Sequence, residues 1–195
     1  MKIFIEGNIA SGKTTIIKYL TKKLKEINSD IIIIPEPIEE WKQIKDEDGQ
    51  NILGYFYNDI KRWSYTFQAT AFLTRSKIIR KYSDKNFIME RSVYSDKNCF
   101  ALNCYQKKLI TKIEWDIYNN WFNWLVKEFS LDADKYIYLR TSPEVAYKRL
   151  KKRDRSEETS VSIDYLKEIH EKHERWLNKK DRNRNILILD GDIKK

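Results

Sequence analysis

The chain has 195 residues, of which 41% are hydrophobic and 34% charged, and its formal net charge is +9. These values predict one soluble globular domain over residues 1–195 and exclude a disordered or fibrous protein. No apolar run approaches the roughly 18–20 residues of a membrane-spanning helix, so we expect no membrane partner. Cys99 and Cys104 are too few for a disulfide framework. Because a strand is predicted from Lys2, leaving no room for a signal peptide, we expect a cytoplasmic protein.

Short apolar segments alternate with longer helical patterns along the chain. The apolar segments predict strands buried on both faces, at residues 3–5, 31–34, 87–89, 136–139 and 186–189. The helical patterns lie near residues 12–27, 54–82, 92–106, 111–129, 143–153 and 162–179. This alternation predicts an α/β fold in which helices flank a five-stranded parallel sheet. Such sheets bind ligands at the carboxyl ends of their strands, so we expect the functional residues there.

The pattern near 111–129 carries apolar side chains on more than one face of a helix. Thr111 and Glu114 have the spacing of a capping box, which predicts where the helix begins. Its large apolar residues are Trp115, Trp121, Phe122, Trp124 and Leu125. Packing in the protein core is the simpler explanation for them, and an interface between two subunits is the alternative.

Residues 7–14, with the sequence GNIASGKT, match the G-x-x-x-x-G-K-[ST] phosphate loop between a strand and a helix. The glycines let backbone N–H groups turn toward phosphates, Lys13 can reach the outer phosphates, and the Thr14 hydroxyl can bind Mg²⁺. A chance turn is the alternative, but the flanking strand and helix favour a nucleotide site. The expected ATP-binding residues of this loop are Gly7, Asn8, Ile9, Ala10, Ser11, Gly12, Lys13, Thr14 and Thr15.

The group that receives the phosphoryl must be recognised by other residues. Glu36 follows the second predicted strand between two prolines, which keep the backbone extended. A carboxylate held there can accept a proton from an attacking hydroxyl, although an exposed acid in a turn is the alternative. Glu90 and Arg91 follow the third strand, where an acid can reach Mg²⁺ and an arginine can face phosphates.

A cluster of arginines follows the fourth predicted strand. Arg149, Arg153 and Arg155 have guanidinium groups that match phosphate oxygens, so they predict an Arg-rich lid over ATP at about residues 149–160. Decoration of a helix face is the alternative for Arg149 and Arg153, which are four residues apart.

The positive net charge also fits a nucleic-acid-binding protein. The lysines, however, are scattered among acidic residues over nearly the whole chain, and no nucleic-acid-binding motif accompanies them. We therefore expect no nucleic-acid partner and keep this function as a remote alternative.

These motifs, in this order over about 180 residues, resemble the deoxynucleoside kinase family. The segments that carry the resemblance are EGNIASGKT at 6–14, EPIEEW at 36–41, YTFQ at 65–68, ERSVYSD at 90–96 and the arginine cluster. The resemblance implies a P-loop kinase fold and a homodimer. It also implies transfer of the γ-phosphoryl group of ATP to the 5′-hydroxyl of a deoxynucleoside, with Mg²⁺, in nucleotide salvage.

The resemblance implies a role for each residue of these motifs. Glu36 would be the base that activates the 5′-hydroxyl, Arg91 would position that hydroxyl, and Lys13 would bind the phosphates. Thr14 and Glu90 would bind Mg²⁺. The implied substrate-binding residues are Ile9, Glu36, Trp41, Tyr57, Phe67, Gln68, Ala71, Arg75, Arg91, Asp96, Phe100 and Glu158. Among them Gln68 would pair with the base, and Tyr57 and Glu158 would bind the 3′-hydroxyl.

Arg75 and Asp96 occupy the positions of an arginine–aspartate pair found in deoxycytidine and deoxyguanosine kinases. Thymidine-accepting relatives carry methionine and alanine there, which leave space for the 5-methyl group of thymine. We therefore expect deoxyguanosine, deoxyadenosine or deoxycytidine to be preferred over thymidine, unless the pair is only structural. A nucleoside monophosphate kinase of the thymidylate type is the main rival function, but Glu36 would repel the phosphate of its acceptor. A nucleotide-binding subunit without activity is a further alternative.

Overall fold

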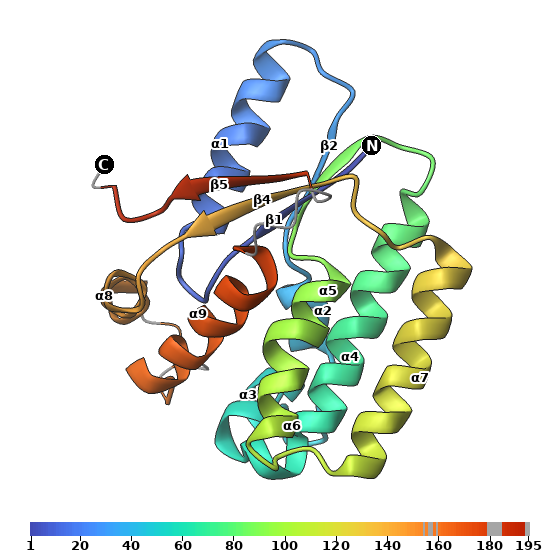
Figure 1. Ribbon diagram of the computed structural model, residues 1–195, viewed down its shortest axis with the longest axis vertical. Helices are drawn as coiled ribbons and strands as arrows, with labels where there is room; N and C mark the ends of the chain where they lie inside the picture. The colour runs from blue at the N-terminus through green and yellow to red at the C-terminus, as the bar shows by residue number, and fades with distance from the viewer. Residues whose placement is uncertain (154, 156–157, 159, 179–184, 194–195) are drawn as a thin grey trace.

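The computed structural model describes residues 1–153, 155, 158, 160–178 and 185–193 (Figure 1). Its strands form one five-stranded parallel sheet in the order β2-β3-β1-β4-β5. The strands are β1 (Lys2–Glu6), β2 (Ile32–Ile34), β3 (Phe87–Glu90), β4 (Lys135–Arg140) and β5 (Ile186–Asp190). The predicted α/β fold with a parallel sheet is confirmed, and each predicted strand lies within two residues of an observed one.

Helices cover both faces of the sheet, with α1 on one face and α4 to α7 on the other (Figure 1). They are α1 (Lys13–Glu26), α2 (Ile38–Gln43), α3 (Ile52–Asn58), α4 (Ile60–Lys81), α5 (Val93–Ser95), the π-helix η1 (Asp96–Ala101), α6 (Leu102–Gln106), α7 (Lys112–Phe129), α8 (Pro143–Arg153) and α9 (Ile163–Leu177). The segments α5, η1 and α6 follow one another without a break where one helix was predicted. The short helix α2 was not predicted.

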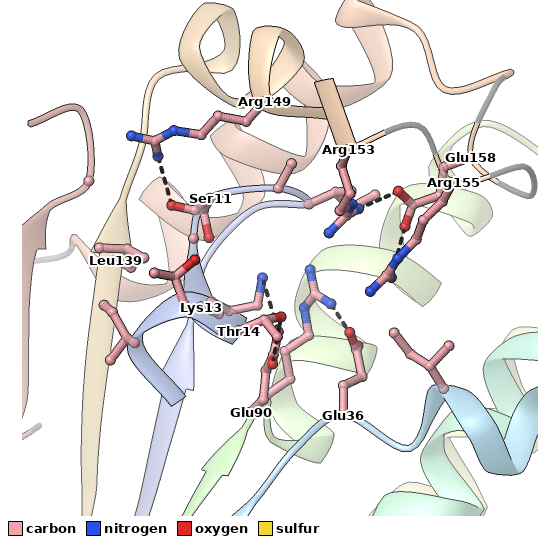
Figure 2. Close-up of a pocket in the computed structure, with 18 of the residues that line it drawn as sticks. Ser11, Lys13, Thr14, Glu36, Glu90, Leu139, Arg149, Arg153, Arg155 and Glu158 are labelled. Atoms are coloured by element: carbon pink, nitrogen blue, oxygen red, sulfur yellow. Dashed lines mark hydrogen bonds and ion pairs between the residues drawn. The ribbon is translucent and has the colours of Figure 1, made fainter. Parts of the chain in front are cut away.

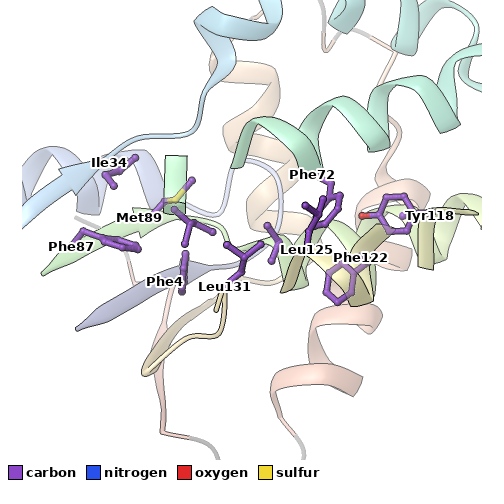
Figure 3. Packing of buried hydrophobic residues seen from close by; sticks show 12 residues of the cluster. Phe4, Ile34, Phe72, Phe87, Met89, Tyr118, Phe122, Leu125 and Leu131 are labelled. Atoms are coloured by element: carbon purple, nitrogen blue, oxygen red, sulfur yellow. The ribbon is translucent and has the colours of Figure 1, made fainter. Parts of the chain in front are cut away.

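The main hydrophobic core lies between the sheet and the helices α4 and α7 (Figure 3). Side chains alternate along β1, so Phe4 packs into this core while Ile5 packs on the opposite face, against Ile17 of α1. Phe72 of α4 stacks on Phe122 of α7 with 5.3 Å between ring centroids. This core fixes the direction of β1 and β3, whose carboxyl ends carry the phosphate loop and the segment after Glu90.

Two predictions of secondary structure are wrong. The helix predicted at 54–82 is two helices, because the Asp59 carboxylate accepts a hydrogen bond from the Arg62 backbone N–H at 3.0 Å and begins a new helix. The strand β5 is not buried on both faces, since it is an edge strand in which Leu187 is 54% and Ile188 43% exposed.

The helix α7 begins after Thr111, which forms the predicted capping box with Glu114. Phe122 lies in the core as expected. For Trp121 and Trp124, core packing is the wrong explanation, because they are 54% and 53% exposed. Within the described ranges, no helix combines the length and apolar character that crossing a membrane requires.

Candidate functional site

A cavity of about 1370 Å³ lies where the strands end. Residues that end or follow each of the five strands line it, as expected for ligand binding to a parallel sheet. Every residue that the sequence predicted for the site lines this cavity except Gly7 and Asn8, which lie at the start of the phosphate loop. The sequence analysis missed Leu53 and Phe56 of α3 and Tyr165 of α9. Phe56 directly precedes the predicted Tyr57, and this adjacency is the signal that could have found it.

The phosphate loop wraps tightly at Gly7, where the backbone φ is +148°. A Cβ atom at this position would lie 2.7 Å from the Leu139 carbonyl oxygen, so only glycine fits. Lys13 begins α1, and its Nζ donates hydrogen bonds to the carbonyl oxygens of Gly7 at 3.1 Å and Asn8 at 2.7 Å. Burial and the nearby Arg91 lower the pKa of Lys13 to about 7. The loop therefore combines backbone N–H groups, a helix N-terminus and the side-chain amine of Lys13, which together suit phosphate binding.

Thr14 and Glu90 come together at the start of α1 and the end of β3 (Figure 2). The Thr14 hydroxyl lies 3.3 Å from Oε1 and 3.1 Å from Oε2 of the Glu90 carboxylate. Lys13 Nζ lies 3.9 Å from the same carboxylate. Hydroxyl and carboxylate oxygens are the ligands that Mg²⁺ prefers, and Mg²⁺ usually keeps several waters and substrate phosphates besides them.

Glu36 follows β2 and points into the cavity (Figure 2). Two arginines bind it there. Its Oε1 accepts hydrogen bonds from Arg75 Nη2 at 2.6 Å and from Arg91 Nη1 at 2.7 Å. Burial alone would raise the pKa of Glu36, but Arg91 and Arg75 outweigh it, so the pKa lies well below its ordinary value. The side chain is only 12% exposed. The alternative of an exposed acid in a turn is therefore wrong, and Glu36 is a largely enclosed, ionised carboxylate.

Arg75 of α4 joins Glu36 to Asp96, the first residue of η1. Its Nε lies 3.0 Å from Oδ1 and 2.9 Å from Oδ2 of Asp96, and its Nη1 donates to the Glu90 carbonyl oxygen at 3.1 Å. Burial raises the pKa of Asp96 to about 6, although Arg75 opposes the shift. The Arg75 guanidinium also lies over the Trp41 ring, 5.3 Å from its centroid. Both residues of the pair line the cavity, and Arg75 also contacts Glu36.

Aromatic rings form the wall of the cavity on the side of α2 to α4. The Trp41 and Phe67 rings meet edge to face at 5.3 Å, and Phe56 stacks on Phe67 at 4.6 Å. Gln68 is buried beside them. Across the cavity the Arg91 guanidinium lies over the Phe100 ring at 4.9 Å. Flat rings around a buried carboxamide suit an aromatic heterocycle such as a nucleobase.

The arginines of the cluster line the cavity while their side chains stay partly exposed to solvent (Figure 2). Arg149 Nη1 donates to the Ser11 carbonyl oxygen of the phosphate loop at 3.0 Å. Arg153 and Arg155 both pair with Glu158, the latter at 3.5 Å. Burial and the nearby Glu158 raise the pKa of Tyr57, and both residues line the cavity. Of the lid predicted at 149–160, positions 154, 156, 157 and 159 lie outside the described residues.

Comparison with known proteins decides the family, because residues 3–195 match the model of the family described as deoxynucleoside kinase. The chain belongs to the deoxynucleoside kinase family. A probable deoxycytidine kinase of fowlpox virus (strain NVSL) is 40% identical to this kinase over 98% of this chain and 79% of its own length. Mitochondrial deoxyguanosine kinase of Xenopus laevis is 36% identical over 96% of this chain and 79% of its own. Mitochondrial thymidine kinase 2 of Homo sapiens is 36% identical over 91% of this chain and 64% of its own length.

This kinase is therefore an ATP-dependent deoxynucleoside kinase, as its motifs predict. The relatives are named for three different nucleosides, so family membership does not fix the base.

Proposed function

We propose that this kinase transfers the γ-phosphoryl group of ATP to the 5′-hydroxyl of a deoxynucleoside with Glu36 as the general base. The position of Glu36 carries this proposal. It lies between the phosphate loop, which would hold ATP, and the aromatic wall, which would hold the base. Its low pKa keeps it ionised at neutral pH, so it can accept the hydroxyl proton as the new P–O bond forms.

The other charged groups would hold the phosphates during this step. Lys13 and the loop N–H groups would bind the outer phosphates of ATP, and Arg91 would hold the 5′-hydroxyl beside Glu36 while facing the γ-phosphoryl group. Arg149, Arg153 and Arg155 would close over ATP and exclude water. Tyr57 and Glu158 would bind the 3′-hydroxyl.

The Thr14 hydroxyl and the Glu90 carboxylate fit Mg²⁺, since both are oxygen ligands within 3.3 Å of each other beside the phosphate loop. Bound there, the ion would neutralise charge that develops on the β- and γ-phosphates.

We propose that deoxyguanosine, deoxyadenosine or deoxycytidine is preferred over thymidine. Arg75 and Asp96 line the cavity and Arg75 lies over Trp41. Their side chains would occupy the space that a 5-methyl group needs. Ala71 and Gln68 line the same end, where Gln68 would pair with the base edge.

We also propose a cytoplasmic homodimer that acts as one domain, without a nucleic-acid or membrane partner. Cys99 and Cys104 are buried free thiols, which suit a reducing compartment. The exposed apolar face of α7 supports the dimer, and its residues are Ile113, Ile117, Trp121 and Trp124.

A steady-state assay with Mg²⁺-ATP, the four natural deoxynucleosides and their 5′-monophosphates tests the proposal. Glu36→Gln should lower kcat by about 10²–10⁴-fold. The matched control is Glu40→Gln, an exposed acid of the same segment, which should retain wild-type kcat. Turnover of monophosphates alone would make this a nucleoside monophosphate kinase, and an unchanged kcat in Glu36→Gln would remove Glu36 from the mechanism.

A further inference from the structure

Glu6 is a buried acid that lies outside the cavity. It ends β1, directly before the phosphate loop, and its side chain is fully buried. Its Oε1 accepts two hydrogen bonds from Ser92, one from the backbone N–H at 2.9 Å and one from the hydroxyl at 2.6 Å. Since Glu6 does not line the cavity, it has no direct access to either substrate.

Ser92 follows Arg91, and the backbone of Arg91 is held in an unusual conformation. Its φ is +63°, in the left-handed region that residues other than glycine rarely adopt. Such a conformation persists only where the surroundings hold it. The contacts that hold it come from β1 and the phosphate loop: Arg91 N–H donates to the Ile5 carbonyl oxygen at 3.0 Å, and Arg91 Nη2 donates to the Gly7 carbonyl oxygen at 3.3 Å.

Along the chain, Glu6 lies between Ile5 and Gly7, the two residues that bind Arg91. Residues 5, 6 and 7 therefore each bind a part of the 91–92 turn, and of these three only Glu6 does so through its side chain. Ser92 also accepts a hydrogen bond from Ser95 N–H at 3.3 Å and so begins the helix that leads to Asp96. Burial raises the pKa of Glu6, but its Oε1 can accept both hydrogen bonds from Ser92 whether or not the acid is ionised. A buried polar side chain needs such bonds, so the two bonds to one serine fix the position of that serine.

We propose that Glu6 is a positioning residue for phosphoryl transfer, which fixes the Arg91 guanidinium against Glu36 through the Ser92 turn. This inference rests on the proposed role of Arg91. Loss of the contact would let the turn relax and move the guanidinium, and small displacements of a positioning group reduce the rate by as much as about 100-fold. The Km for ATP should change little, because the phosphate loop keeps its own contacts.

The test uses Glu6→Gln and Ser92→Ala, each made in the wild-type chain and in Arg91→Lys. Glu6→Gln keeps the size and one acceptor oxygen of the side chain but replaces Oε2 with an amide nitrogen, and Ser92→Ala removes only the hydroxyl. The matched control is Ser95→Ala, which removes a buried hydroxyl of the same turn that makes no hydrogen bond with the described residues. We expect each test variant to lower kcat by about 10-fold in the wild-type chain, less than 2-fold in Arg91→Lys, and the control to leave kcat unchanged.

Equal losses in both backgrounds would overturn the inference, because a purely structural defect does not depend on the side chain at 91. A rise in the Km for ATP with kcat unchanged would also overturn it and assign Glu6 to the phosphate loop. If Ser92→Ala keeps wild-type kcat, the inference fails even where Glu6→Gln does not fold. If Arg91→Lys alone keeps wild-type kcat, the proposed role of Arg91 fails first, so the two failures can be distinguished.

Discussion

Replacing Arg75 or Asp96 alone should destabilise this kinase, and replacing both should cost less than the sum of the two. The pair is almost fully buried, and Arg75 makes hydrogen bonds to Asp96, to Glu36 and to the Glu90 carbonyl oxygen. In Arg75→Met the Asp96 carboxylate loses its only cation within hydrogen-bond distance among the described residues, while Glu36 keeps Arg91.

The expected magnitude follows from these contacts. Breaking a buried ion pair from one side typically costs about 3–5 kcal/mol. The pKa of Asp96 is already raised to about 6, so without Arg75 it takes up a proton near neutral pH, which limits the loss to about 3 kcal/mol. Asp96→Ala should cost about 2 kcal/mol, because Arg75 keeps Glu36. The double variant removes both charges, so a coupling free energy of about 2 kcal/mol is expected.

Urea unfolding at pH 7 of the wild type, both single variants and the double variant measures this coupling. Losses that add to within about 0.5 kcal/mol would refute the reasoning that the two charges depend on each other. The same four proteins test base preference. A methyl-sized space changes discrimination by roughly 10–200-fold, so the thymidine to deoxycytidine ratio of kcat/Km should rise by that order in the double variant.

Two further variants test the metal site and the acid stability. Thr14→Val should raise the Mg²⁺ concentration for half-maximal activity, because it removes one of the two proposed oxygen ligands; an unchanged Mg²⁺ titration would exclude Thr14 as a ligand. Burial lowers the pKa of His173 to about 3, so the folded state binds fewer protons than the unfolded state between about pH 3 and 6.5, and stability falls as the pH drops through that window. When the pH is lowered from 7 to 5, the free energy of unfolding of His173→Phe should therefore fall by about 2 kcal/mol less than that of the wild type, as measured by urea unfolding. Equal decreases in the two proteins would contradict the low pKa of His173.

The sequence predicts those features of this protein that are determined by residues close together in the chain. The phosphate loop is a local motif, and buried parallel strands are continuous apolar runs, so both are found correctly. The break at Asp59 was missed because the helical pattern continues across it, and one side-chain hydrogen bond decides the outcome.

Features that depend on distant residues could not be predicted in the same way. Leu187 is exposed because β5 lies at the edge of the sheet. The order of the strands depends on how all five segments pack, so no single segment predicts it. The contact of Arg75 with Glu36 joins residues that are 39 positions apart and requires the final packing of α4 against β3. Glu6 gave no signal of its own, since one acid at the end of a strand fits many structures.

The left-handed backbone at Arg91 limits which amino acids can replace it. Glycine would suit the backbone but would remove the guanidinium that binds Glu36. Any other residue with a cationic side chain would have to adopt the same left-handed backbone conformation, which costs residues other than glycine roughly 1–2 kcal/mol. No amino acid satisfies both demands, so this position is a poor starting point for directed evolution. A search for new nucleoside substrates should vary the aromatic wall around Trp41 and Phe67 and leave the 91–92 turn intact.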